Sequence, residues 1–249
     1  MATYKETVGT AVEQYAGNKP VVLEGELWYD SSAYAWKYQY ANTTTASWST
    51  GGNLNTARNY IAGAGSTQDA SLAFGGFKPS AANETEYYNG SAWAEVNNLN
   101  SARGAGQGSG SPASVIYAGG DPTTADTESW NGTNWTEVNN LNSGRKYGGA
   151  AGASNTDALV FGGLNGSDDL TELWNGTNWT EVNDLNQGRY GLSGSGKIST
   201  AALTASGREP AFSTKTESWN GTNWTEVNDV NTARDFMGSN GTQTSALIY

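Results

Sequence analysis

The chain has 249 residues and a formal net charge of −11 at pH 7. This acidic balance opposes binding to phosphate backbones and anionic membranes, and no basic cluster relieves it locally. The sequence contains neither cysteine nor histidine, which excludes disulfides, thiolate chemistry and the commonest general base and transition-metal ligand. We therefore expect no cofactor, no metal site, no nucleic-acid partner and no membrane insertion.

The first 33 residues do not share the pattern of the rest of the chain. Residues 1–17 lack a basic segment followed by an apolar core, so they do not predict an export signal. Residues 25–32, Gly-Glu-Leu-Trp-Tyr-Asp-Ser-Ser, predict a strand and a turn. We interpret residues 1–33 either as a cap on one side of the following domain or as an arm that docks on a partner.

The remaining sequence is a tandem repeat. The decapeptide Trp-Asn-Gly-Thr-Asn-Trp-Thr-Glu-Val-Asn occurs three times, at residues 130–139, 174–183 and 219–228. Five copies share one tryptophan followed ten residues later by an arginine; the pairs are Trp48 and Arg58, Trp93 and Arg103, Trp135 and Arg145, Trp179 and Arg189, and Trp224 and Arg234. A period in the forties is typical of propeller blades or helical arrays. The repeats contain no ten-residue stretch with apolar residues at positions i, i+3, i+4 and i+7, so the units must be built from strands and not from helices.

Each unit predicts four strands, which we name a to d. In the best-preserved copy, Asn131-Gly132 predicts a two-residue hairpin turn between strands c and d, with Trp130 and Trp135 as diagonal neighbours on one face. Residues 147–153 have small side chains suited to an inner strand a, and residues 158–161 are an apolar strand b followed by a Gly pair.

The order of the strands predicts a ring. The chain opens with a c/d pair at residues 36–50 and ends with an a/b pair at residues 234–249, so neither end is a whole blade. Pairing of residues 245–249 with residues 35–40 completes an all-β, five-bladed β-propeller without exposed sheet edges. The expected domains are an arm over residues 1–33 and a propeller over residues 34–249.

Two features carry family resemblances. An apolar strand ending in Gly-Gly, then an aromatic residue, then a tryptophan about six residues later, as from Tyr87 to Trp93, resembles the kelch repeat, which implies four-stranded propeller blades. The sequence departs from it where the fourth copy, residues 201–207, lacks the Gly pair. Residues 25–32 and the Trp-Asn-Gly-Thr-Asn-Trp units also resemble elements of bacteriophage virion and tail proteins, marine phages included.

The repeated arginines and tryptophans each have two interpretations. The arginines could form a channel ring that binds an anion, but a structural role is favoured, in which each guanidinium bonds carbonyls or the repeated glutamates Glu95, Glu137, Glu181 and Glu226. The tryptophans could be sugar-stacking platforms, but the core between blades is favoured. The Asn-x-Thr triplets match a glycosylation pattern that the turns already explain.

The best candidates for recognition are the loops between strands b and c, because the copies diverge there: residues 77–83, 121–126, 164–170 and 207–214. Loops on a rigid scaffold commonly carry binding, although unconstrained drift explains the divergence equally well. The candidate binding residues in these loops are Phe77, Lys78, Asp121, Asp126, Asn165, Asp168, Asp169, Arg208 and Glu209. Asp168 and Asp169 could at best hold calcium weakly.

We expect a noncatalytic interaction module of a virus particle, an appendage, decoration or tail adhesion protein. Its N-terminal arm binds other virion proteins and its b/c loops face outward toward partner proteins or host glycans. The expected location is the virion, assembled in the host cytoplasm, with an extracellular protein as the alternative. The alternative functions are a lectin with one shallow site per blade and, less favoured, a glycoside hydrolase using two loop carboxylates.

Overall fold

Strands and turns make up all regular structure in the described part of this computed structural model, which comprises residues 14–15, 27–38, 50–164, 166 and 168–249. These residues form no α-helix, and hence none that could cross a membrane. The expectation of an all-β chain is confirmed. The chain divides into two units, residues 1–50 and residues 51–249, which are described separately.

The first unit contains a three-stranded sheet. Strand β2 (Leu27–Asp30) pairs in parallel with β1 (Gln14–Tyr15) and antiparallel with β3 (Ala35–Tyr38). The Asp30 carboxylate shapes the β2–β3 turn, since its Oδ1 accepts hydrogen bonds from the backbone N–H groups of Ser32 and Ala33. The strand and turn predicted for residues 25–32 are therefore present. Residues 39–49, which include most of the predicted first c/d hairpin and Trp48, lie outside the described residues.

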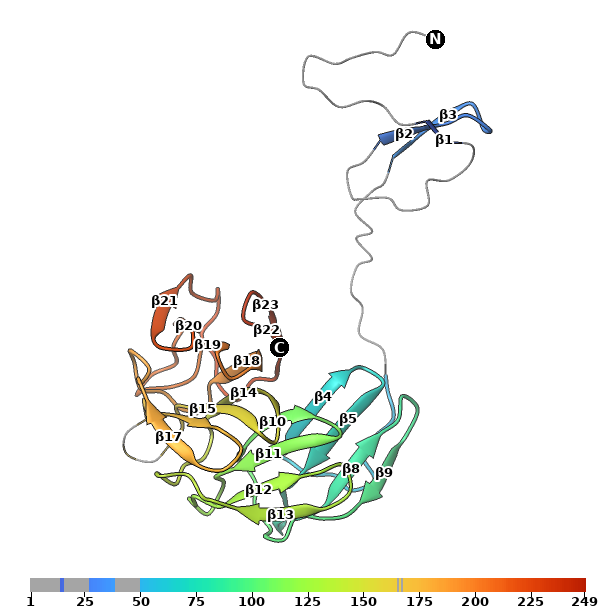
Figure 1. The fold of residues 1–249 in the computed structure, drawn as a ribbon. Helices are drawn as coiled ribbons and strands as arrows, with labels where there is room; N and C mark the ends of the chain where they lie inside the picture. The colour runs from blue at the N-terminus through green and yellow to red at the C-terminus, as the bar shows by residue number, and fades with distance from the viewer. Residues whose placement is uncertain (1–13, 16–26, 39–49, 165, 167) are drawn as a thin grey trace. The chain divides into compact units, whose positions relative to one another are not determined.

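The second unit contains four antiparallel four-stranded sheets, which we call blades 1 to 4 (Figure 1). Blade 1 comprises β4 (Ala62–Thr67), β5 (Ala70–Phe74), β8 (Thr85–Tyr88) and β9 (Trp93–Val96). Blade 2 comprises β10 (Gln107–Ser111), β11 (Ser114–Ala118), β12 (Thr127–Trp130) and β13 (Trp135–Val138). In Figure 1 the first strands of the sheets lie nearest the common centre, as a propeller-like arrangement requires.

Blades 3 and 4 repeat this order, and a shorter sheet follows them. Blade 3 comprises β14 (Gly149–Ser154), β15 (Asp157–Phe161), β16 (Thr171–Trp174) and β17 (Trp179–Val182). Blade 4 comprises β18 (Ser193–Ile198), β19 (Ala201–Ala205), β20 (Thr216–Trp219) and β21 (Trp224–Val227). Strands β22 (Ser239–Thr242) and β23 (Ser245–Ile248) form a two-stranded sheet, the half-blade. A minor hairpin of β6 (Phe77–Lys78) and β7 (Ser80–Ala81) lies within the blade 1 loop.

The inner strands contain glycine because neighbouring blades approach closely there. A Cβ atom built on Gly108 of blade 2 would lie 2.7 Å from the Phe74 ring of blade 1. A Cβ atom on Gly194 of blade 4 would lie 2.6 Å from the backbone nitrogen of Ala150 in blade 3. The small-residue strand predicted for residues 147–153 thus corresponds to the innermost strand β14, as expected from crowding around a shared axis.

The turn between strands c and d differs from the sequence prediction. Trp130 pairs directly with Trp135, so the loop has the four residues Asn131 to Asn134 instead of two. The Asn131 side chain accepts hydrogen bonds from the backbone N–H groups of Thr133 (3.0 Å) and Asn134 (2.9 Å), which makes the longer loop favourable. The two indoles are consequently directly opposite, with ring centroids 5.4 Å apart, and not diagonal neighbours.

The tryptophan pairs form the core between consecutive blades. Trp130 is 2% exposed, and both Trp130 and Trp135 pack on apolar residues of blade 1 that include Leu72 and Phe74. Blades 3 and 4 use their tryptophans in the same way against blades 2 and 3. The favoured core interpretation of these tryptophans agrees with this burial, and the buried indoles offer no surface on which a sugar could stack.

Polar contacts align the outer strands of neighbouring blades. The Asn139 side-chain nitrogen of blade 2 donates to the Thr177 carbonyl (2.9 Å) and to Asn178 Oδ1 (2.9 Å) in the blade 3 turn. The same contacts join Asn97 to the blade 2 turn and Asn183 to the blade 4 turn. The second and last asparagines of the repeated decapeptide therefore connect one blade to the next.

Candidate functional site

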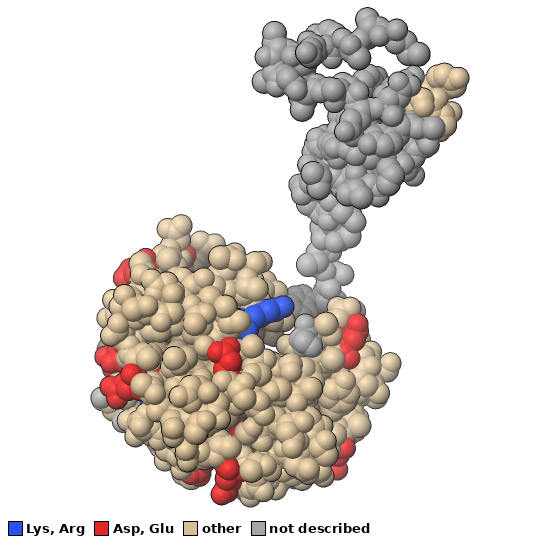
Figure 2. Space-filling model, viewed as in Figure 1, with Lys and Arg blue, Asp and Glu red and all other residues tan. Residues whose placement is uncertain are grey.

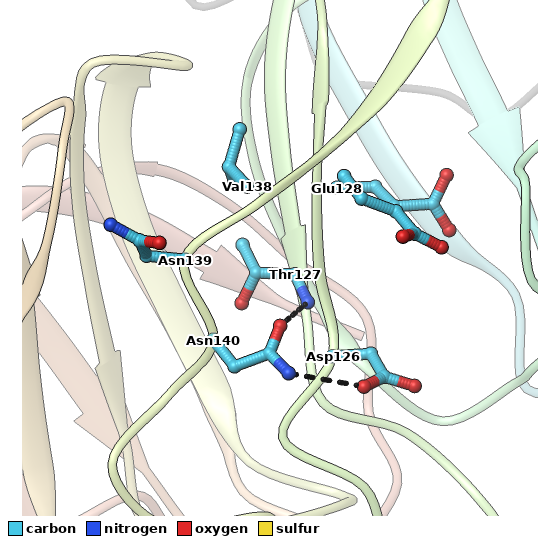
Figure 3. Close-up of a pocket in the computed structure, with 7 residues that line it drawn as sticks. Asp126, Thr127, Glu128, Val138, Asn139 and Asn140 are labelled. Carbon is cyan, nitrogen blue, oxygen red and sulfur yellow. Dashed lines mark hydrogen bonds between the residues drawn. The ribbon is translucent and has the colours of Figure 1, made fainter.

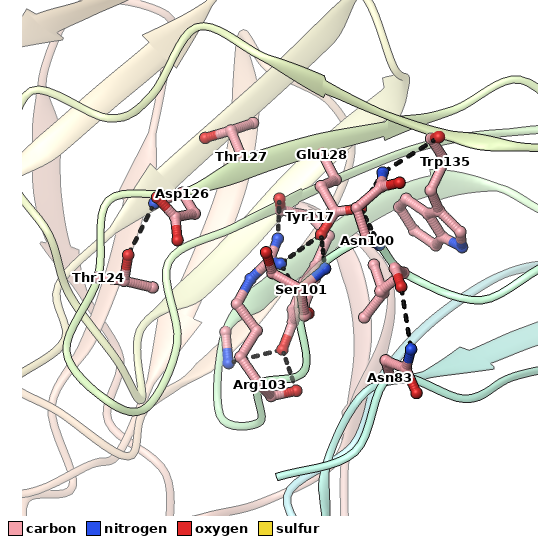
Figure 4. Close-up of polar contacts among 12 residues, drawn as sticks. Asn83, Asn100, Ser101, Arg103, Tyr117, Thr124, Asp126, Thr127, Glu128 and Trp135 are labelled. Carbon is pink, nitrogen blue, oxygen red and sulfur yellow. Dashed lines mark hydrogen bonds and ion pairs between the residues drawn. The ribbon is translucent and has the colours of Figure 1, made fainter.

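A buried ion pair in each blade fixes the loop between strands b and c. In blade 2 the Arg103 guanidinium contacts the Glu128 carboxylate and donates to the Gly119 carbonyl (3.0 Å), directly after strand b (Figure 4). The same carboxylate accepts hydrogen bonds from the backbone N–H groups of Asn100 (2.8 Å) and Ser101 (3.2 Å). The b/c loop is thereby held against the segment that enters its own blade.

The same clamp is present in the other three blades. The pairs are Arg58 with Glu86 (2.7 Å), Arg145 with Glu172 (2.6 Å) and Arg189 with Glu217 (2.7 Å). The favoured structural role of these arginines agrees with the geometry, but the partner glutamates predicted from the sequence were wrong. The partners lie on strand c, whereas Glu95, Glu137, Glu181 and Glu226 are exposed on strand d. Because the four paired guanidinium groups are buried, they do not form an anion-binding ring.

The clamp gathers the b/c loops at one end of the blades, which we call the b/c-loop face. In blades 1 to 4, a single β-bridge ties the residue after the repeated arginine to the following loop; the bridges join Asn59 to Phe77, Gly104 to Asp121, Lys146 to Leu164, and Tyr190 to Arg208. Three predicted binding residues, Phe77, Asp121 and Arg208, are therefore brought into one circle. Lys146 adds an ion pair to Asp121 of the neighbouring blade (2.7 Å).

An aromatic cluster at the centre of this face was missed by the sequence analysis. Tyr60, Tyr147 and Phe236, from three different blades, have ring centroids 5.0 to 5.7 Å apart. Each lies two residues after a repeated arginine, and we call the three side chains the central plate. Ala105 and Gly191 occupy the same position in the other two units. The only signal in the sequence was therefore a position that varies between the units and that lies two residues after the arginine present in all five.

The five equivalent positions are linked in series by backbone hydrogen bonds. Ala105 donates to the Tyr60 carbonyl (2.9 Å), Tyr147 to Ala105 (2.8 Å), Gly191 to Tyr147 (2.7 Å) and Phe236 to Gly191 (2.8 Å). All five residues have a positive φ, from 48° to 62°, which is unusual for the four that are not glycine. The bulky side chains alternate with small ones, and this leaves room for the three rings.

The other predicted binding residues lie in two further places. Lys78 forms an ion pair with Glu84, and the hydrogen bond from Lys78 holds the pKa of that carboxyl below its ordinary value. Glu209 of the blade 4 loop lies against Asp168 of the blade 3 loop, with Asp169 nearby. Asn165 lies outside the described residues. Among the residues that the structure describes, no group of three or more acidic side chains is arranged to hold a metal ion.

The carboxyl pair of Glu209 and Asp168 makes a testable prediction about pH. A shared hydrogen bond with Asp168, some desolvation and repulsion from both aspartates raise the pKa of Glu209 above its ordinary value. Because the folded-state pKa is the higher one, this group favours folding at low pH and loses that contribution as pH rises through it. We expect Asp168→Asn to change the Glu209 titration, measured by carboxyl ¹³C NMR, whereas Asp126→Asn leaves it unchanged.

Asp126 belongs to a separate pocket on the outer part of blade 2. This pocket, about 370 Å³, is lined by seven residues that include Asp126, Glu128, Glu137 and Asn140 (Figure 3). The Asn140 side chain donates to Asp126 (3.3 Å) and accepts from the Thr127 N–H (3.1 Å). It therefore satisfies the backbone N–H of the first residue of strand c. Glu128 is held by its clamp partners, which leaves Glu137 as the free-standing carboxylate of the pocket wall.

A second, larger cavity lies where the inner strands of the blades converge. It has a volume of about 880 Å³ and is lined by the inner strands of all four blades and of the half-blade. Its walls consist mainly of glycine, alanine and serine, with Lys197 as the cationic lining residue. On the face drawn in Figure 2, a basic patch lies near the centre with an acidic patch close beside it, and further acidic side chains lie toward the edge.

Comparisons with known proteins add no family to these observations. A scan against protein-family models finds no match to the chain, and a search of curated proteins finds none that is similar in sequence. The functional inferences that follow therefore rest on the residues and on their geometry.

Proposed function

We propose that the chain is a noncatalytic interaction module of a virus particle that presents its b/c-loop face to partner proteins or host glycans. The observation that supports this best is that the most divergent segments of near-identical blades lie on one face, each held by an ion pair that is repeated in every complete blade. The resemblance of residues 25–32 to phage virion elements assigns the N-terminal arm to attachment on other virion proteins, during assembly in the host cytoplasm.

The carboxylates support a noncatalytic role over a glycoside hydrolase. The four strand c glutamates are paired with buried arginines, and Glu209 and Asp168 share a hydrogen bond. Carboxyl groups in such close contact leave no room for a glycosidic bond, because the two catalytic groups of a hydrolase lie roughly 5 to 10 Å apart.

We also propose that the propeller closes as a ring of five blades, with residues 35–50 as the outer hairpin of the half-blade. In three blades, the indole N–H of the strand d tryptophan donates to a threonine Oγ1 that begins strand c of the preceding blade. These contacts are Trp135 to Thr85 (3.0 Å), Trp179 to Thr127 (3.2 Å) and Trp224 to Thr171 (3.1 Å). Thr216 is the fourth such threonine. It is 5% exposed, and its Oγ1 has no partner among the described residues.

The equivalent tryptophan of the fifth unit is Trp48, so we assign it as the donor to Thr216. The half-blade also has exposed apolar residues where complete blades bury theirs. Leu247 and Tyr249 are each 56% exposed, while the equivalent Leu159 and Phe161 in blade 3 are 0% exposed. An outer hairpin beside β23 would cover these positions and pair the free edge of that strand.

Matched threonine substitutions test the closure. If Trp48 donates to Thr216, Thr216→Val leaves a buried indole N–H unpaired and costs about 1–3 kcal/mol of unfolding free energy, as does the control Thr171→Val. Urea denaturation of the full chain measures both. In addition, Trp48→Phe and Thr216→Val should combine non-additively. A Thr216→Val variant that is as stable as the wild-type chain would contradict the assignment of Trp48.

Association with particles tests the function directly. We expect the chain to copurify with capsid or tail particles from lysed host cells, and a chain that lacks residues 1–33 to stay behind. An intact chain that is absent from purified particles would refute the virion role. A stand-alone lectin is the second candidate, favoured by the exposed aromatic rings at the centre of the b/c-loop face.

A further inference from the structure

The central plate has the surface of a binding site and not that of a buried plug. Tyr60 and Phe236 are each 46% exposed, although each also packs against Tyr147 and against the other. Phe77 of the blade 1 loop extends the aromatic surface, with its ring centroid 6.3 Å from that of Tyr60. Three aromatic side chains from three blades thus meet on one open face.

The backbone is strained to place these rings. A left-handed conformation is unfavourable for a residue with a side chain, and Tyr60, Tyr147 and Phe236 adopt it, as does Ala105. Gly191 shows that glycine, which avoids this cost, fits the same position in the series. Ala105 and Gly191 show that this position does not require a large side chain, so the backbone conformation alone does not explain three aromatic residues here.

Polar side chains flank the plate. The Lys146 ammonium lies 5.5 Å above the centre of the Tyr147 ring and is bound to the Asp121 carboxylate. Asn59 and Asp235 directly precede Tyr60 and Phe236 in the sequence. An apolar surface bordered by a carboxylate and an ammonium suits a ligand that has both C–H faces and hydroxyl groups.

We propose that the central plate binds one sugar residue of a neutral glycan, stacked on Tyr60 and Phe236, with Asp121 and Lys146 bonding its hydroxyl groups. This rests on the proposed function and names the ligand of its outward face. A stable protein interface requires roughly 800 Å² from each partner, whereas three partly exposed rings offer an area comparable to one or two sugar rings. The net charge of −11 and the carboxylates of Asp121, Asp168 and Glu209 on this face disfavour acidic sugars.

The test uses the full chain with neutral gluco-, manno-, galacto- and N-acetylglucosamine pentasaccharides, and with oligogalacturonate as an acidic counterpart. Isothermal titration calorimetry should show one site per chain for at least one neutral sugar and none for the acidic one. Tyr60→Leu, which keeps the apolar bulk but removes the ring, should weaken binding about tenfold or more. Phe212→Leu is the matched control, because Phe212 is exposed on the blade 4 loop and makes no ring contact with the plate.

A second measurement needs no variant. The chain has five phenylalanines, so ¹³C labelling of phenylalanine gives a readable set of ring signals. Binding should shift the signals of Phe236 and Phe77 but not those of Phe74 and Phe161, which are buried between blades. Four or five sites per chain, undiminished binding by Tyr60→Leu, binding to none of the sugars, or a partner protein seated on the plate would each overturn the proposal. Copurification with particles is measured without sugar. The proposed virion role can therefore be correct even if the sugar-binding proposal is wrong.

Discussion

Replacing Trp130 by alanine is expected to lower the free energy of unfolding by about 3–5 kcal/mol. The indole is 2% exposed and packs between blades 1 and 2 with Trp135, Leu72 and Phe74. It also donates a hydrogen bond to the Pro112 carbonyl (3.0 Å), which Trp130→Ala leaves unpaired. Since close-packed blades cannot collapse fully around the lost ring, a cavity adds to the lost transfer free energy.

Thermal or urea denaturation followed by circular dichroism measures this loss. Phe212→Ala is the control, because Phe212 is 56% exposed, and changes at exposed sites usually stay within about 0.5 kcal/mol. An unchanged melting temperature for Trp130→Ala would return the tryptophans to the list of ligand sites.

The second large effect is expected for Arg145→Met. This substitution leaves the Glu172 carboxylate buried without its cation and frees the Gly162 and Leu170 carbonyls, which accept hydrogen bonds from Arg145. Breaking a buried ion pair by removing one partner costs about 3–5 kcal/mol. We further expect the blade 3 loop to exchange its amide hydrogens faster, because the clamp holds that loop against the entry to its own blade.

An exposed ion pair provides the comparison. Lys215, which directly precedes β20, contacts Glu226 of β21 where both side chains reach solvent, so Lys215→Met should destabilise the chain far less than Arg145→Met. Removing both clamp partners, as in Arg145→Met with Glu172→Leu, should recover part of the stability. Equal losses for Arg145→Met and Lys215→Met would refute the clamp as the element that fixes the b/c loops.

The strand content and the blade repeat were predictable, but the hairpin register was not. The Asn-Gly pair predicts a turn, and alternation predicts that Trp130 and Trp135 share a face. Both a two-residue and a four-residue loop satisfy that alternation, because they differ by an even number of residues. The choice depends on Asn131, whose side chain caps the N–H groups of Thr133 and Asn134, a contact that the alternation pattern does not encode.

The candidate site was only partly predictable for a similar reason. Each unit has two repeated glutamates, and Glu128 pairs directly opposite Glu137 in the hairpin, so periodicity does not tell which one is buried. The position of the entering segment decides it, since this segment runs past strand c. The central plate was missed because it comprises one residue from each of three units, and only the packing of the blades against one another brings them together.

Closure of the ring is tested most directly by amide hydrogen exchange along β23 in the full chain. If residues 35–50 pair with this strand, every amide from Ser245 to Ile248 should exchange slowly, as in the equivalent central strand β15. A chain that lacks residues 1–50 should then lose protection at alternate amides of β23. Fast exchange at alternate amides in the full chain itself would contradict the five-bladed ring.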